Sequence, residues 1–268
     1  MSNETTTFKV GKKTFNLQPV ERDNRIDSVR GLFLVLMSID HFGGWITDYT
    51  WQFYGYVTNA EGFVFLSGFV FALVYGRYIV NYRLLAKRIF KRSFTVYKYH
   101  LLLVLVLPYI ALMIPVYIPY WKNMLSYFFV DGTPFKYIIS STLLLNQPTY
   151  MDVLPMYAIF ILFCWPLLIL MSKGFDYYAL AICIGVWIIG QFFNPIEFIS
   201  NIYFPKAFPG IFNIFSWQIL FFIGAFLGFR KKLGNKIHFL DNRITIIVGF
   251  AIYIIILLSR YNLGSVHK

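Results

Sequence analysis

The sequence is poor in charged residues and in cysteine. Only 13% of its 268 residues are charged, whereas 58% are hydrophobic and 21% are aromatic. This leaves too little polar surface to coat a globule in water, so the composition excludes a soluble protein and predicts a polytopic membrane protein. The two cysteines, Cys164 and Cys183, lie in apolar runs far from any histidine. Neither a disulfide framework nor a metal site is therefore predicted.

The first residues lack the apolar stretch of a cleavable signal peptide, so the first span is expected to serve as the insertion signal. Residues 1–24 are polar and carry several basic side chains, which is typical of a cytoplasmic tail. The net charge of +12 does not indicate nucleic-acid binding, because the basic residues gather between apolar runs. The positive-inside rule accounts for that pattern.

The apolar runs of residues 25–268 predict one all-α transmembrane domain, a bundle of about seven spans with a cytoplasmic N-terminus. The expected spans are Arg25–Trp45, Glu61–Arg77, Leu101–Pro119, Val153–Met171, Tyr177–Phe193, Phe215–Phe229 and Ile244–Leu258. The densest basic segment, Arg77 to Lys98, is expected to be an inner loop. Tyr137–Leu145 is apolar but too short to cross, so it is interpreted as an interfacial or re-entrant piece.

The first predicted span carries charged and ionisable residues that a membrane helix normally avoids: Asp27, Arg30, Asp40 and His41. Eleven helical steps of about 100° place Arg30 and His41 on one face, about 16 Å apart along the axis. Pairing of Asp27 with Arg30 is the structural alternative. Within a membrane, ionisable groups more often mark a reaction centre or an ion path, so this face is the leading candidate site.

Two carboxylates at the outer ends of later spans are further candidates. Glu61 begins the second span, where it is either a partner of the helix dipole or a site residue. In the run LLLNQPTYMDVLPMY, the apolar strip breaks at Asn146, Gln147 and Pro148 and resumes after Asp152. Asp152 either caps the fourth span, or orients His41 or binds a polar acceptor. Asp40 points about 100° away from His41 on a helix, so a carboxylate from another span is the more suitable partner.

Other polar side chains near the predicted membrane surfaces are candidates for ligand binding. Asn213, Trp217 and Gln218 begin the sixth span from outside and suit stacking on a sugar and hydrogen bonding to it, although Trp217 also fits an interfacial aromatic belt. The inner patch around Arg88 and Arg92 has a plain alternative as a topogenic signal that binds anionic lipid.

Several of these motifs occur together in one order: the histidine motif of the first span, EGFVFLSGFVFALVYGR, QPTYMDVLPMY and NIFSWQILFFIGAFLG. In this combination the chain resembles the OpgC-like family, which succinylates osmoregulated periplasmic glucans and is a branch of the integral-membrane acyltransferase 3 superfamily. The resemblance extends from Arg25 to about Gly228. Members usually carry about ten spans, whereas seven are visible here, so the chain is expected to be either a shortened member or one that lacks a C-terminal portion.

The resemblance implies an inner-membrane O-acyltransferase whose active site faces the periplasm. His41 is the implied catalytic residue, helped by Asp152 or Glu61. Arg30 and Ser67, of the Ser-Gly-Phe motif, are implied in donor binding, and Arg88 and Arg92 match the superfamily's inner arginine motif loosely. The sugar acceptor is expected at Asp40, Asn213, Trp217 and Gln218. Acyl-coenzyme A, in particular succinyl-coenzyme A, is the expected co-substrate, and no tightly bound cofactor or metal is expected. Membrane lipids and a periplasmic glucan are the expected partners.

Two other functions fit parts of the sequence. In a transporter or proton channel, the charges of the first span would form a relay, although no paired broken helices occur in two matching halves. The second is an inactive scaffold of a glucan-synthesis complex, which would explain the small number of spans.

Overall fold

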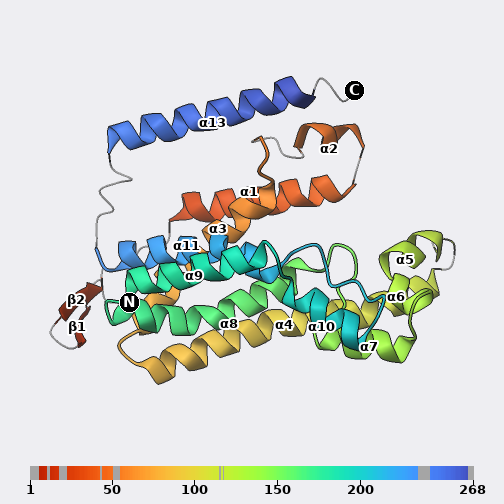
Figure 1. Ribbon diagram of the computed structural model, residues 1–268. Helices are drawn as coiled ribbons and strands as arrows, with labels where there is room; N and C mark the ends of the chain where they lie inside the picture. Colours follow the sequence, from red (N-terminus) through yellow and green to blue (C-terminus); the bar gives the residue numbers. More distant parts are fainter. Residues whose placement is uncertain are drawn as a thin grey trace. The chain divides into compact units, whose positions relative to one another are not determined.

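A computed structural model describes residues 6–10, 13–17, 23–42, 44–50, 55–114, 116, 118–234 and 242–264. The chain divides into two compact units, Met1–Val80 with Ile223–Lys268, and Asn81–Phe222. The division falls inside helix α11 (Ile214–Lys232). Each unit is mainly helical, in agreement with the predicted all-α class (Figure 1).

The first unit contains a hairpin that the sequence did not predict. Strands β1 (Thr6–Val10) and β2 (Lys13–Leu17) pair in antiparallel fashion, with Thr6 opposite Leu17. The unit's helices are α1 (Asn24–Phe42), α2 (Trp45–Thr50), α3 (Asn59–Tyr75), the 3-10 turn η1 (Gly76–Tyr78), the second half of α11 and α13 (Arg243–Gly264). Helix α1 packs against α2 and α3.

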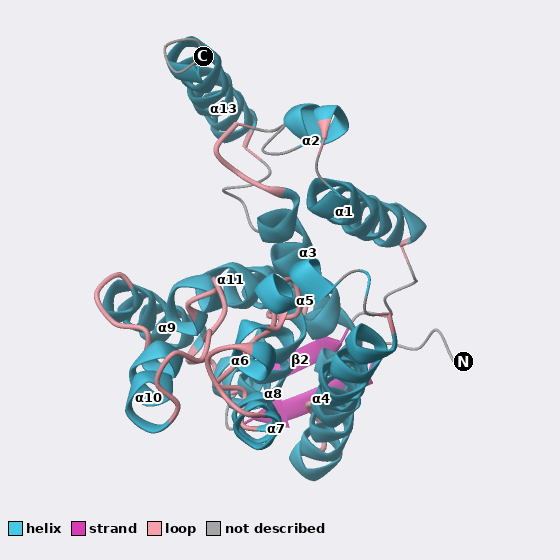
Figure 2. Ribbon diagram, turned by 90° about the vertical axis from the view of Figure 1, so that its right-hand side faces the viewer, coloured by secondary structure: helices cyan, strands magenta, loops and turns pink. Residues whose placement is uncertain are grey.

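The second unit is built on long apolar helices. Its elements are α4 (Tyr82–Met113), α5 (Ile118–Met124), α6 (Ser126–Phe129), α7 (Pro134–Thr142), α8 (Val153–Ser172), α9 (Asp176–Gly190), α10 (Pro195–Tyr203) and the first half of α11. Helix α8 contacts both α4 and α9, and Figure 2 shows these helices nearly end-on. Phe160, Ile161 and Leu168 of α8 are fully buried, which makes α8 the centre of this unit.

Local sequence fixes where several helices begin. The side chains of Asn81, Thr133 and Asn194 accept hydrogen bonds from the first-turn amides of α4, α7 and α10, respectively. In α7 and α10 a proline follows the cap, where its missing N–H costs nothing because that amide would have no helical partner.

The number of predicted spans is not confirmed. In the described residues, four helical segments are long and apolar enough to cross a membrane: α3 with η1, α4, α8 and α11. Helices α9 and α10, bent by 48° at their junction, make a fifth if they form one broken span. Helix α1 does not qualify as an apolar span, because Arg25, Asp27, Arg30 and Asp40 interrupt it. The apolar part of α13, Arg243–Ser259, is shorter.

The predicted inner loop and third span are one continuous helix. From Tyr82 onward, the basic segment expected as a loop forms the first half of α4, which runs for 32 residues from Tyr82 to Met113, whereas Arg77 lies in η1. The predicted loop conformation was wrong because Leu85, Ile89 and Val96 recur at helical spacing between the basic residues, and all three are buried. The inner location of the segment stays a prediction. By contrast, the predicted start of the fourth span at Val153 is confirmed in α8.

Candidate active site

Helices α1 and α3 form an antiparallel pair that carries two of the four predicted donor-binding residues, Arg30 and Ser67. Arg30 of α1 contacts Ser67 of α3, whereas Asp40, further along α1, accepts a hydrogen bond of 3.0 Å from the Asn59 amide at the start of α3. Between these contacts, the Phe33 ring lies so close to Gly62 that a Cβ there would be 2.7 Å from it. The absence of a side chain at Gly62 therefore lets the two helices approach.

Arg30 lies partly buried in this pair and keeps hydrogen-bonding capacity. Its Nη2 donates to Ser67 Oγ at 3.4 Å, and its Nη1 lies 3.8 Å from Asp27 Oδ1. The guanidinium carbon is 5.7 Å from the centre of the Phe63 ring. Its Nε is buried and has no hydrogen-bond partner among the described residues. Because its contacts with Ser67 and Asp27 are both long, the guanidinium has donors to offer an anionic ligand.

A different arginine neutralises the carboxylate that precedes α1. The exposed Arg25 pairs with Asp23 at 3.2 Å, and this hydrogen-bonded guanidinium lowers the pKa of the Asp23 carboxyl. Arg30 is thus left with Asp27 as its acidic neighbour on α1.

His41 lies in the last turn of α1, and its side chain is exposed. The helix runs without interruption from Arg30 to His41, so the predicted common face is geometrically retained. The neighbouring Asp40 accepts hydrogen bonds from Asn59 Nδ2 and Thr50 Oγ1. Those bonds attach the end of α1 to both α2 and α3. Asp40 therefore has a structural role next to His41 in the sequence. Its predicted role in acceptor binding stays a prediction.

Glu61 forms a capping box at the start of α3. Its Oε2 accepts hydrogen bonds from the backbone N–H of Thr58, at 2.9 Å, and from the Thr58 hydroxyl. The amide of Ala60 in turn donates to Thr58 Oγ1. Glu61 therefore has a structural role at the N-terminus of α3, as the alternative prediction stated. Its catalytic role stays a prediction.

Asp152 is buried, and its carboxylate does not cap α8. It occupies the N-cap position with helical backbone angles and makes no side-chain capping bond. Instead, its Oδ2 accepts a 3.0 Å hydrogen bond from the backbone amide of Ile211. The capping alternative is thus wrong: Asp152 holds a loop 59 residues further along the chain. It belongs to the second unit and His41 to the first, so their pairing stays a prediction.

Arg88 and Arg92 are exposed on the first half of α4, one helical turn apart. This spacing puts them on the same face of the helix, where they can bind an anion or lipid headgroups together. They belong to the second unit, whereas Arg30 belongs to the first. Their participation in one donor site with Arg30 stays a prediction.

The predicted acceptor-binding amides make internal hydrogen bonds. Asn213 Nδ2 donates to the carbonyls of Gly190 and Phe193, at 2.7 and 3.0 Å. Gln218 Nε2 donates to the carbonyl of Cys183 at 2.7 Å and to that of Phe215 at 3.2 Å. The Trp217 ring packs edge-on against Phe212. Both amides therefore hold α9 to α11, and sugar binding by them would have to compete with these bonds.

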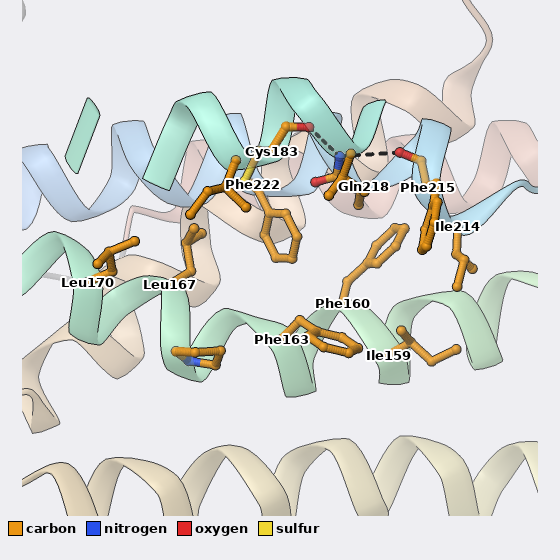
Figure 3. Close-up of a pocket in the computed structure, with 13 residues that line it drawn as sticks. Ile159, Phe160, Phe163, Leu167, Leu170, Cys183, Ile214, Phe215, Gln218 and Phe222 are labelled. Atoms are coloured by element: carbon orange, nitrogen blue, oxygen red, sulfur yellow. Dashed lines mark hydrogen bonds between the residues drawn. The ribbon is translucent and has the colours of Figure 1, made fainter. Parts of the chain in front are cut away.

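Gln218 borders an apolar cavity of about 360 Å³ between α8, α9 and α11. Figure 3 shows the rings of Phe160, Phe163 and Phe222 at this cavity, with the Gln218 amide turned to backbone carbonyls. A cavity with this lining accommodates hydrocarbon rather than sugar.

Sequence reasoning missed a second cavity, which is polar. It lies within the second unit where residues 123–127, 146–149 and 206–208 meet Tyr137. The break in the apolar strip at Asn146 and Gln147 was visible in the sequence. No local pattern links that break to residues 206–208, because the contact spans 62 residues.

Comparison with known families supports the motif pattern. The OpgC protein family matches residues 22–267. The chain belongs to the OpgC family. Membership indicates a glucan-modifying, acyltransferase-like membrane protein, and the match includes the α1–α3 pair as well as the helices of the second unit. No curated protein and no solved structure matches the chain significantly.

Proposed function

We propose that this OpgC protein is an inner-membrane O-acyltransferase that transfers an acyl group from acyl-coenzyme A to hydroxyls of a periplasmic glucan. Succinyl is the proposed acyl group, and the reaction centre faces the periplasm. The observation that carries the proposal is the contact between Arg30 and Ser67, at 3.4 Å. These residues come from two separate motifs, and the family resemblance implies donor binding for both.

The proposed donor, acyl-coenzyme A, is anionic, so the part of the site that binds it needs cations. Coenzyme A carries phosphates, which guanidinium groups bind through charge-assisted, often bidentate hydrogen bonds. Arg30 supplies such a group with an unpartnered Nε. Arg88 and Arg92 are proposed to contribute further positive charge from the exposed face of α4.

His41 is proposed as the general base. The neutral imidazole takes the proton of a glucan hydroxyl while that oxygen attacks the thioester carbonyl. The new C–O bond forms, the C–S bond breaks, and the coenzyme A thiolate leaves with the proton returned by the imidazolium. Asp152 or Glu61 is proposed to orient the imidazole and stabilise its charge.

Mass spectrometry of periplasmic glucans from cells with and without the gene tests this function. We expect acidic acyl substituents, with the mass of succinyl esters, only when the gene is present. Complementation with the intact gene should restore them. Identical glucans in both strains would refute the proposed activity.

Replacing Arg30 with lysine tests the donor site. The ammonium keeps the charge but loses the planar fork, so we expect the KM for acyl-coenzyme A to rise roughly tenfold or more with a smaller change in kcat. Arg243→Lys, at the exposed start of α13, is the matched control and should leave both constants unchanged. An unchanged KM in Arg30→Lys would remove Arg30 from donor binding.

A further inference from the structure

The polar cavity of the second unit has the form of a binding site for a small hydrophilic group. Its volume is about 290 Å³, close to the lower end of the range for small-molecule pockets, about 300–1,000 Å³. Its lining mixes amide, hydroxyl and aromatic side chains; these include Asn123, Ser126, Tyr127, Tyr137 and Gln147.

Several polar side chains around this cavity have unused hydrogen-bonding capacity. Asn123, Ser126 and Thr149 make no side-chain hydrogen bond within the described part of the chain. Gln147 Nε2 donates a hydrogen bond to the carbonyl of Leu144 at 2.9 Å. The acceptor atom of the same side-chain amide is Oε1. That oxygen is buried and has no partner among the described residues. The buried, unpartnered oxygen of Gln147 indicates a missing hydrogen-bonding ligand at this cavity, whose lining also offers the polar groups of Asn123, Ser126 and Thr149.

The loops that form the cavity are held together by hydrogen bonds that involve neither the side chains of Asn123, Ser126 and Thr149 nor Gln147 Oε1. The amide of Gln147 donates to the carbonyl of Phe208 at 2.6 Å, and the amide of Phe208 donates to Asn146 Oδ1 at 3.1 Å. Asn146 Nδ2 donates in turn to Ser141 Oγ at 2.9 Å. Two loops far apart in the sequence are thereby fixed to each other and to α7, so the cavity is preorganised.

Backbone strain is concentrated around the same cavity. In the described chain, the non-glycine residues with positive φ are Leu144 (62°), Tyr150 (71°) and Lys206 (71°). Leu144 and Tyr150 flank the lining segment 146–149, and Lys206 itself lines the cavity. Side chains rarely adopt this conformation, and strained residues of this kind cluster at ligand sites.

The lining favours a neutral ligand over an ionic one. Its cation, Lys206, is mostly exposed and lies 3.6 Å from Asp131, which offsets its charge. The buried Tyr137 donates its hydroxyl to the carbonyl of Val104, and burial raises the pKa of this phenol, so it stays uncharged. Amides, hydroxyls and aromatic rings together match the hydroxyl groups and apolar faces of a sugar ring.

The segments that form the cavity are those that the basic-residue pattern assigns to the outer side of the membrane. Both loops carry few basic residues, as outer loops do. The cavity also adjoins a candidate catalytic residue: a Cβ on Gly210 would lie 2.9 Å from Asp152 Cβ and 3.2 Å from Gln147 Cγ. Gly210 has a φ of +88°, which suits glycine at this close contact.

We infer that this cavity is a subsite for a glucose unit of the acceptor glucan, bound through Asn123, Ser126, Gln147 and Thr149. The inference rests on the proposed function for the identity of the acceptor. It assigns acceptor binding to residues other than Asn213, Trp217 and Gln218.

Sugar binding by the purified full-length protein in detergent tests the subsite without any acyl donor. Saturation-transfer NMR would be measured with glucose disaccharides of different linkage and with a longer gluco-oligosaccharide. The test variant combines Asn123→Ala with Thr149→Val, because neither side chain makes a hydrogen bond in the structure. The matched control combines Asn201→Ala with Thr142→Val, whose side chains also make none and do not line the cavity.

We expect wild-type protein and the control to bind at least one of the sugars and the test variant to bind it at least about fivefold more weakly. All three proteins should show the same thermal unfolding. If the wild type binds none of the sugars, or the test variant binds like the wild type, the subsite is refuted. Failure of the proposed function is distinct: sugar would bind at the cavity, but wild-type cells would contain no acylated glucan.

Discussion

His41→Ala is expected to abolish acyl incorporation into periplasmic glucan while the protein is still inserted and expressed. The imidazole is exposed at the end of α1, so its removal leaves no buried cavity. A positioned general base contributes about 10²- to 10⁴-fold to rate, and the loss should have that size. The measurement is glucan mass spectrometry in cells that carry the variant, with its membrane level determined by immunoblot.

His41→Gln separates catalysis from hydrogen bonding at this position. Glutamine can donate and accept hydrogen bonds, but it cannot take up a proton near neutral pH. If His41 acts as the base, both variants are inactive. Activity in His41→Gln close to that of the wild type would assign the imidazole a structural role only.

Among single glycine-to-alanine substitutions in the first unit, Gly224→Ala is expected to cause the largest loss of stability. A Cβ at Gly224 would lie 2.1 Å from the backbone carbonyl oxygen of Phe65, and one at Gly228 would lie 2.2 Å from that of Phe69. The obstacle in each case is the backbone of α3, which cannot rotate away. Overpacking typically costs about 1–3 kcal/mol and sometimes more, so the apparent melting temperature in detergent should fall by several degrees.

Gly249→Ala and Gly185→Ala are the matched controls for this substitution. Both glycines lie inside helices, and an added Cβ would meet no atom within 4 Å. Since alanine favours a helix by about 1 kcal/mol over glycine, these variants should be as stable as the wild type or slightly more so. A melting temperature for Gly224→Ala equal to that of the controls would contradict the close packing of α3 and α11.

The sequence predicted those features that depend on local pattern. The apolar run from Val153 begins after a polar break that contains Pro148, and it gives α8 with its predicted start. The spacing of Arg30 and His41 predicted that both lie on one helix, and α1 contains both. In these cases, helical periodicity and composition decide the outcome within a few turns.

The sequence could not supply features that depend on distant backbone groups. Asp152 was expected to cap its own helix as one alternative, but its carboxylate makes no capping bond and accepts a hydrogen bond from the amide of Ile211. Asn213 and Gln218 were expected to be available to sugar, but backbone carbonyls of α9 and the turn after it take their donors. Backbone groups carry no side-chain signal, so a sequence gives no sign of which of them will be near a given polar side chain.

The unbroken length of α4 couples the membrane anchor to the basic patch. Its 32 residues extend about 48 Å, whereas the hydrocarbon core is about 30 Å thick. The surplus turns carry exposed basic side chains and are rigidly continuous with the apolar ones. Thinning or thickening of the bilayer therefore shifts the height of these cations relative to the headgroups, and added salt weakens their hold on anionic lipid without changing the helix itself.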